Sequence, residues 1–369
     1  MSTYTIALLA GDGIGPEIMD EAVKILRLVE SRNTVTFDLK PALFGASAYF
    51  ETGKSFPEES VAICDQADAI LKGTIGLNHE DSKTIPVDEQ PERGALLPMR
   101  RRYDTYANFR PVYLPRSLAH FSPLKAEVIG DGIDLIIIRE LVGGLYFGSK
   151  KSGVDDQGRR YVHEMLEYNE DQIRRVLEVA FQLASKRKKV LHNIHKSNVL
   201  KSSVLWNEIV EEVRPSYPDI EVKHVLVDAA ATYLCLDPAS FDVMVMENMF
   251  GDILSDQGGG ILGSLGLMPS ACVGPEKSYY EPSHGSAPDI AGQGIANPYS
   301  MIGSVAMMLE MSFGMESEAH NLWRAMQSVF AAGYTTPDLA RRGKSEKKIS
   351  TAEFGDRVAT ELGKQPVDN

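Results

Sequence analysis

Short apolar runs alternate with amphipathic stretches along most of this 369-residue chain. The first run, Ile6 to Leu9, is followed by the turn-forming cluster Gly11 to Pro16 and then by apolar residues at helical spacing. Further runs predict strands at 69–71, 135–138, 190–191, 225–227 and 243–245, and the pattern predicts helices at 171–186, 203–213 and 300–313. This alternation indicates an α/β protein with a largely parallel sheet.

One polar segment interrupts the alternation. Residues 149–161 are polar and contain glycine, which is typical of an exposed hairpin or arm. The chain has no low-complexity linker and no internal repeat. Its length and its 43% apolar content suffice for two packed domains, and strands that cross from one domain to the other must join them.

The charge balance narrows the class of partner. Lys and Arg number 38 against 51 Asp and Glu, and the net charge of −13 repels nucleic acid and anionic membranes. A small anionic substrate therefore needs a local basic patch. The cysteines Cys64, Cys235 and Cys272 are scattered, which predicts neither a disulfide framework nor a zinc site. No apolar run reaches 18 residues and no basic leader precedes Tyr4, so we expect a cytoplasmic protein.

Two carboxylates stand four residues apart where a strand is expected to lead into a helix. Asp252 and Asp256 would share one face of that helix, and like charges this close repel unless water or a cation separates them. The flanks at 241–246 and 261–265 are apolar, which favours a hard divalent cation, Mg²⁺ or Mn²⁺. The alternative is a solvated helix face.

Three arginines are candidates for binding a dicarboxylate. We expect Arg100, Arg110 and Arg139 at strand ends, where a guanidinium can bind a carboxylate through two hydrogen bonds. Tyr146 follows past Gly143 and Gly144, where a turn could bring its hydroxyl beside the ligand of Arg139. The alternative for each arginine is an ordinary surface charge, and the alternative for Tyr146 is a tyrosine packed in the core.

Two further residues follow predicted strands. Lys196 comes after the run at 190–191, and a metal nearby would disfavour its ammonium form and make it a usable base. Asp228 comes after the run at 225–227 and could be a third carboxylate for the ion. The carboxyl ends of strands are where α/β proteins place their sites.

Two glycine-containing segments raise the question of a nucleotide. The turn Gly11 to Gly15 invites a phosphate-binding interpretation, but its glycine spacing differs from the dinucleotide fingerprint, which leaves a tight structural turn as the alternative. The loop from Glu281 to Asn297 is long, rich in small residues and able to approach a ligand closely. Within it, Asp289 could accept hydrogen bonds from the ribose hydroxyls of NAD and would repel the 2′-phosphate of NADP.

Four segments carry a resemblance to a known family: residues 11–17, residues 139–146, residues 248–256 and residues 284–297. Together they resemble the β-decarboxylating 2-hydroxyacid dehydrogenases, the isocitrate/isopropylmalate dehydrogenase family. The resemblance runs from about Ile6 to Leu339. It implies a two-domain α/β fold that is not the Rossmann fold, with largely parallel sheets and a protruding arm near 149–162. Residues 1–105 and 263–369 would form a discontinuous cofactor-side domain, with 106–262 inserted as the dimerisation and metal domain.

The resemblance also implies roles for particular residues. It assigns catalysis to Tyr146, Lys196 and Asp228, and a shared active site in which a homodimer partner supplies Lys196 and Asp228. The cation would be bound by Asp228, Asp252 and Asp256. The implied substrate contacts are Leu96, Leu97, Arg100, Arg110, Arg139 and Val199. The implied NAD contacts are His284, Gly285, Ser286, Ala287, Asp289, Ile290 and Asn297.

The implied reaction is the NAD- and metal-dependent oxidative decarboxylation of 3-isopropylmalate, a step of leucine biosynthesis. Two stretches depart from that branch of the family: Leu71 to Asn78 replaces a Gly-Gly-Pro-x-Trp run, and His195-Lys196-Ser197 replaces Asp-Lys-Ala. The alternatives are therefore a related 3-alkylmalate, 3-benzylmalate or tartrate dehydrogenase. A non-catalytic scaffold is a further alternative, although every expected acid, base and arginine is present.

Overall fold

The computed structural model describes residues 2–340 and 346–367. The chain divides into two compact units. The first comprises residues 1–104, 117–123 and 262–369, and the second comprises 105–116 and 124–261. Residues 117–123 thus group with the first unit although they lie within the stretch that we expected to be inserted. None of the helices that the model describes is long and apolar enough to cross a membrane.

Five strands of the first unit lie side by side in the order β2-β1-β3-β12-β11. Strand β1 pairs in parallel with β2 and β3, β3 pairs in parallel with β12, and only β11 runs antiparallel to its neighbour β12. Their bounds are β1 Ser2–Gly11, β2 Val35–Pro41, β3 Ala69–Thr74, β11 Pro269–Val273 and β12 Ser278–Pro282.

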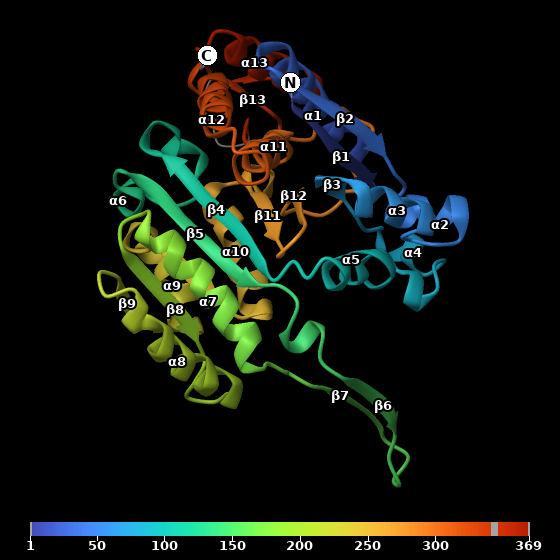
Figure 1. The fold of residues 1–369 in the computed structure, drawn as a ribbon, viewed down its shortest axis with the longest axis vertical. Helices are drawn as coiled ribbons and strands as arrows, with labels where there is room; N and C mark the ends of the chain where they lie inside the picture. The colour runs from blue at the N-terminus through green and yellow to red at the C-terminus, as the bar shows by residue number, and fades with distance from the viewer. Residues whose placement is uncertain (1, 341–345, 368–369) are drawn as a thin grey trace. The chain divides into compact units, whose positions relative to one another are not determined.

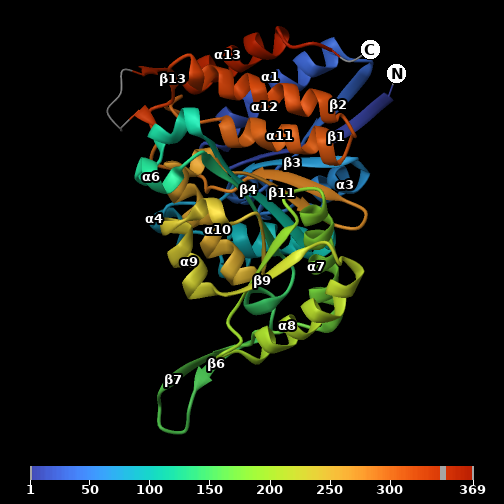
Figure 2. The same ribbon diagram turned by 90° about the vertical axis from the view of Figure 1, so that its left-hand side faces the viewer.

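Four helices of the first unit pack against one another (Figures 1 and 2). They are α1 Gly15–Arg32, α11 Tyr299–Met311, α12 Glu316–Ala331 and α13 Thr351–Gly363. Helix α11 is buried almost throughout, because it lies against β11, β12 and the other helices. The remaining elements of this unit are shorter: α2 Ala46–Thr52, α3 Glu58–Gln66, α4 His79–Ser82, α5 Leu97–Arg102, β13 Tyr334–Thr335 and β14 Lys347–Lys348.

The turn after β1 is a structural turn and not a phosphate cradle. Its backbone amides already have protein acceptors: Asp12 donates to the carbonyl of Thr74, and Ile14 donates to that of Ser286. The buried Asp12 carboxylate accepts from the amides of residues 46, 47 and 76. At Gly11, whose φ is +77°, a Cβ would lie 2.0 Å from the oxygen of Thr74. The glycine spacing therefore reflects close backbone approach.

Five strands of the second unit lie side by side in the order β4-β5-β10-β8-β9. Strands β4 and β5 pair antiparallel, whereas β5, β10, β8 and β9 pair in parallel. The prediction of largely parallel sheets is therefore confirmed. The bounds are β4 Ala107–Pro115, β5 Gly132–Glu140, β8 Val190–His195, β9 Glu221–Leu226 and β10 Val243–Met246.

Helices cover this second set of strands. Helices α7 Glu170–Ser185 and α8 Lys201–Val213 bury an apolar stripe against alternate residues of the strands, including Ile138, Val243 and Val245. Helix α9 Val227–Leu236 and helix α10 Asn248–Leu262 lie apart from them (Figure 2). A short helix, α6 Ala126–Ile129, completes the unit.

The predicted arm is present. Strands β6 Lys150–Val154 and β7 Arg160–Glu164 pair antiparallel and extend away from the rest of their own unit (Figure 1). Two apolar side chains of this hairpin are exposed, Val154 at 64% and Val162 at 69%. An isolated two-stranded ribbon is marginally stable in water.

Candidate functional site

A cluster of arginines and carboxylates occupies the second unit at the start of α10. Arg139 lies at the carboxyl end of β5, is 1% exposed, and donates to Asp252 on α10. Its Nε and Nη2 both donate to the amide oxygen of Asn248, at 3.0 and 2.7 Å. Asn248 in turn donates to the carbonyl of Gly143, at 3.0 Å. The first residue of α10 therefore fixes both the guanidinium and the loop that leads to Tyr146.

Arg110 approaches the same two carboxylates. Its Nη1 lies 3.7 Å from an oxygen of Asp252 and 3.4 Å from one of Asp256, and it donates to Ser255 at 2.6 Å. Asn108 accepts from its Nε at 2.7 Å. Two buried guanidinium groups therefore face two carboxylates one helical turn apart. The two carboxylates therefore meet buried cations on one side and solvent on the other, with side chains that are 37% and 55% exposed.

The predicted positions of the arginines are correct only in part. Arg139 does end a strand, but Arg110 lies within β4 and Arg100 lies on the short helix α5. The position of Arg110 was predicted wrongly because it is the fourth residue of β4, and no apolar run precedes it to mark the strand. Arg100 is 5% exposed in the first unit, where its Nε donates to the hydroxyl of Tyr279 at 2.9 Å.

Tyr146 belongs to the second-unit cluster. Its hydroxyl donates to Asp252 at 2.9 Å, and the guanidinium of Arg139 lies 5.7 Å from its ring centre. Burial, reinforced by the charge of Asp252, raises the pKa of Tyr146 to about 12. The phenol is therefore protonated at neutral pH.

Lys196 and Asp228 form a separate pair in the second unit. The ammonium of Lys196 donates to Asp228 at 2.7 Å, and this hydrogen bond lowers the pKa of the carboxyl below its usual range. Lys196 directly follows β8, and Asp228 opens α9. Val199, between them in sequence, is 69% exposed. The described residues of the chain contain no cluster of three or more His, Cys, Asp or Glu side chains able to hold a metal.

The predicted cofactor loop lines a cavity in the first unit. The cavity has a volume of about 320 Å³, within the range of small-ligand sites. Among its lining residues are the predicted contacts His284, Gly285, Ala287, Ile290 and Asn297. Burial lowers the pKa of His284, whose imidazole bonds Ser300 at 2.8 Å, and this favours the neutral ring.

Two other predicted cofactor residues have different surroundings. The Ser286 hydroxyl donates to the carbonyl of Gly76 at 2.7 Å, and this hydrogen bond fixes the loop to the segment around Gly76. Asp289 is exposed, and its backbone carbonyl accepts from Gln293. Sequence reasoning missed Asp338, which lines the cavity and accepts from Asn297 at 3.2 Å and from Ser264 at 2.5 Å. It lies 41 residues from Asn297, in a turn with no distinctive motif.

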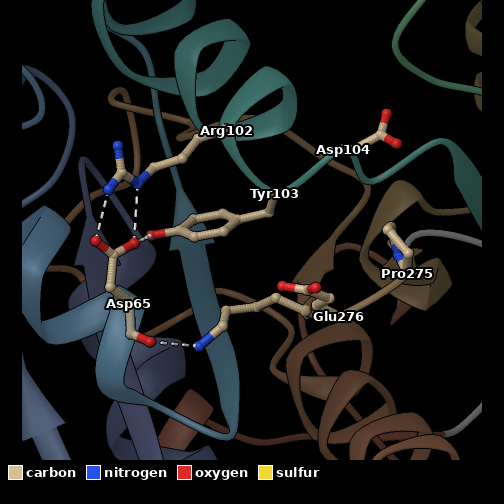
Figure 3. A pocket seen from close by; sticks show the side chains of 7 residues that line it. Asp65, Arg102, Tyr103, Asp104, Pro275 and Glu276 are labelled. Carbon is tan, nitrogen blue, oxygen red and sulfur yellow. Dashed lines mark hydrogen bonds and ion pairs between the residues drawn. The ribbon is translucent and has the colours of Figure 1, made fainter.

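A second cavity of the first unit, of about 450 Å³, is larger (Figure 3). Its charged groups already bind one another: Arg102 donates twice to Asp65, and Tyr103 donates to the same carboxylate at 3.0 Å. Lys277 donates to the carbonyls of Cys64 and Asp65 at the end of α3. These bonds tie secondary-structure ends together, and none of the residues predicted to act in catalysis lines this cavity.

Leu96 and Leu97, the predicted contacts of the substrate side chain, stand at the start of α5. Both are partly exposed, and they precede Arg100 by four and three residues. On a helix this spacing places them on the same side as the guanidinium. The departing stretch nearby has structural partners, since Thr74 donates to the carbonyl of Asp12 and Asn78 caps α4.

Comparison with known proteins agrees with this architecture. Residues 5–358 match the model of the isocitrate/isopropylmalate dehydrogenase family, and the chain belongs to that family. It is 44% identical to a 3-isopropylmalate dehydrogenase of Aquifex aeolicus, over 98% of both chains, and 45% identical to one of Thermotoga maritima, over 97% and 98%. The isocitrate dehydrogenase structure of Methylococcus capsulatus superposes with a TM-score of 0.85 at 32% identity, covering 97% and 99%. The predictions of family and fold class are confirmed.

Proposed function

We propose that this chain catalyses the NAD- and divalent-metal-dependent oxidative decarboxylation of 3-isopropylmalate in leucine biosynthesis. The observation that carries the proposal is the convergence of Arg110, Arg139 and Tyr146 on Asp252, next to Asp256. Relatives that share 44–46% of their residues with nearly the whole chain are named for this activity, which favours it over the related dehydrogenases. The proposed location is the cytoplasm, where the three free cysteines would stay reduced.

The α10 carboxylates fit a hard cation. Asp252 and Asp256 offer oxygen donors one turn apart, and their side chains are 37% and 55% exposed. Mg²⁺ and Mn²⁺ prefer such donors and complete their coordination with water and substrate oxygens. We assign Asp228 of a second copy as the third carboxylate. When bound, the cation would polarise the substrate's oxygens and stabilise the negative charge that develops during decarboxylation.

The chain's own residues then have distinct tasks. Arg110 and Arg139, with Arg100 of the first unit, bind and orient the carboxylates of the malate. Lys196 helps to remove the proton of the 2-hydroxyl, which passes to water or to the Asp228 carboxylate that the ammonium already contacts. Tyr146 donates its phenolic proton to the carbon that loses carbon dioxide.

We assign the cavity beside His284 and Asn297 to NAD. Its lining is mostly apolar, with polar groups from Asn297 and Asp338, which suits the adenosine part of the cofactor. The exposed Asp289 carboxylate would accept from the ribose hydroxyls and repel a 2′-phosphate. When bound there, NAD would supply the acceptor for the hydride that leaves the substrate's second carbon.

A homodimer is part of the proposal. Exposed apolar side chains on α9 and α10, Tyr233 at 51%, Leu236 at 63% and Ile253 at 60%, are unusual for a surface that meets only water. The exposed Val199 and the Lys196–Asp228 pair belong to the same unit, and we propose that they complete the active site of a second copy. Leu96, Leu97 and the partner-facing Val199 then enclose the isopropyl group.

The substrate panel is the direct test. We expect kcat/KM to be highest for 3-isopropylmalate when malate, 3-methylmalate, 3-benzylmalate, tartrate and isocitrate are compared under the same conditions. An apolar pocket discriminates by about 1–3 kcal/mol per methylene, so other 3-alkylmalates should react more slowly. Isocitrate should fail because its extra carboxylate would meet leucines without a partner. A maximum at 3-benzylmalate would support the specialised alternative, and a maximum at tartrate or isocitrate would refute the pocket.

A further inference from the structure

A buried lysine stands at the carboxyl end of β3 in the first unit. Lys72 is 2% exposed, and its ammonium lies 2.6 Å from Oε2 of Glu281 on the neighbouring strand β12. The strands pair in parallel with Leu71 opposite Tyr280, so the next residues, Lys72 and Glu281, face one another. The ammonium also donates to the carbonyl of Gly73 at 2.8 Å. This lysine belongs to the stretch that departs from its branch of the family.

The same carboxylate faces a second cation. Nη2 of Arg100 lies 3.7 Å from Oε1 of Glu281, while the Nε of Arg100 donates to the hydroxyl of Tyr279 at 2.9 Å. The thiol of Cys272 approaches Oε1 at 3.7 Å. Two buried cations therefore share one buried carboxylate, and the shorter contact belongs to Lys72. At 3.7 Å the guanidinium is held next to Glu281 without a close, two-bond ion pair.

We propose that Lys72 is a positioning residue that neutralises Glu281 and thereby leaves the Arg100 guanidinium available to a substrate carboxylate. The inference rests on the proposed function, in which Arg100 binds the malate. A buried carboxylate without a cation is costly, and an arginine pairs with one through two parallel hydrogen bonds when it can. Without Lys72, Glu281 would draw Arg100 into such a pair, and the substrate would compete with it.

The inference predicts effects of opposite sign within one cluster. Lys72→Met keeps most of the side-chain volume but removes the charge, and we expect KM for the best substrate to rise about tenfold with kcat within twofold. Glu281→Gln removes the competitor for Arg100, so KM should stay at or below the parent value. The double variant Lys72→Met/Glu281→Gln should return KM to within about twofold of the parent.

A matched control separates this effect from general loss of an ion pair. Lys54 also makes a 2.6 Å ion pair, with Glu89, but its side chain is 68% exposed. Lys54→Met should leave KM, kcat and the thermal midpoint unchanged within error, because exposed pairs contribute little. The thermal midpoint of each variant reports any change in folding independently of KM.

Several outcomes would overturn the inference. One is an unchanged KM in Lys72→Met, and another is a KM that also rises in Glu281→Gln. The third is a double variant whose KM stays as high as that of Lys72→Met. If Lys72→Met does not fold, the double variant is compared with Glu281→Gln, and a tenfold gap in KM between them refutes the role. Failure of the proposed function is distinguishable, since the parent enzyme itself would then turn over none of the malates.

Discussion

The hydroxyl of Tyr146 donates to Oδ2 of Asp252 at 2.9 Å, so the proposed proton donor and a proposed metal ligand are directly bonded. Arg139 donates to the other oxygen of the same carboxylate. Both oxygens of Asp252 therefore face groups that the proposed reaction uses. Asp252 would thus hold the cation and also position the proton donor, which couples metal binding to the placement of Tyr146.

Tyr146→Phe should impair protonation more than oxidation. Phenylalanine keeps the ring beside Arg139 but removes the hydroxyl, and loss of a positioned acid costs about 10²–10⁴ in rate. We expect carbon dioxide release to fall at least a hundredfold, and single-turnover NADH formation to fall less. Tyr113→Phe on β4, at a 41% exposed tyrosine, is the control. Equal turnover of Tyr146→Phe and the parent would make Tyr146 a packing residue.

Asp252→Asn should weaken the cation site. The amide keeps the shape of the side chain and removes its charge, and we expect kcat to fall by about two orders of magnitude. Mn²⁺ affinity, followed by the paramagnetic signal of the free ion, should fall in parallel. Asp131→Asn, at a carboxylate that is 96% exposed, should change neither quantity. Full activity of the parent in excess EDTA would refute the metal assignment.

Two of the glycines of α10, Gly251 and Gly260, give a matched test of how Arg139 is held. A Cβ at Gly251 would lie 2.5 Å from Cγ of Arg139, whereas a Cβ at Gly260 would have no atom within 4 Å. Gly260→Ala should stabilise the protein by about 0.5–1 kcal/mol, as alanine does within a helix. Gly251→Ala should instead lower the thermal midpoint and raise KM, because the buried arginine must move. Equal effects of the two substitutions would contradict the close packing.

The sequence predicts the elements more reliably than their joint geometry. The strand before Asn248 and the helix that carries Asp252 and Asp256 could be predicted, because apolar runs and helical spacing are local signals. The pairing of Lys72 with Glu281 could not, since it depends on the register of strands about 200 residues apart in sequence. Asp338 was missed because it lies in a turn with no distinctive motif, 41 residues from its partner Asn297.

Glu140 should make stability depend on pH. It is fully buried, burial raises its pKa to about 7, and the amides of Val142 and Gly143 only partly offset this. The folded state therefore keeps a proton that the unfolded chain, with a pKa near 4.5, has lost. The contribution of Glu140 to the free energy of unfolding therefore falls as the pH rises from about 4.5 to 7, by up to about 3 kcal/mol.

Glu140→Gln should flatten that slope. The slope is measured from the thermal midpoints of the parent and the variant at pH 5, 6, 7 and 8. Slopes are compared, and not absolute midpoints, because the amide of the variant also loses one backbone hydrogen bond. Burial also raises the pKa of Glu247, which shares the hydroxyl of Tyr168 with Glu140. The Glu140→Gln variant should therefore keep a residual dependence of stability on pH. Parallel pH profiles for parent and variant would show that Glu140 is ionised throughout.

Asp289 should set the choice of cofactor. Its exposed carboxylate would meet the 2′-phosphate of NADP, and we expect the parent to favour NAD at least tenfold in kcat/KM, about 1.4 kcal/mol. Asp289→Asn removes the charge but keeps an acceptor for the ribose, so the preference should narrow mainly through a lower KM for NADP. Glu276→Gln removes another exposed negative charge from the same unit and should leave the ratio unchanged. If the parent used both cofactors equally well, or if both variants shifted the ratio alike, net charge and not a contact at Asp289 would govern selection.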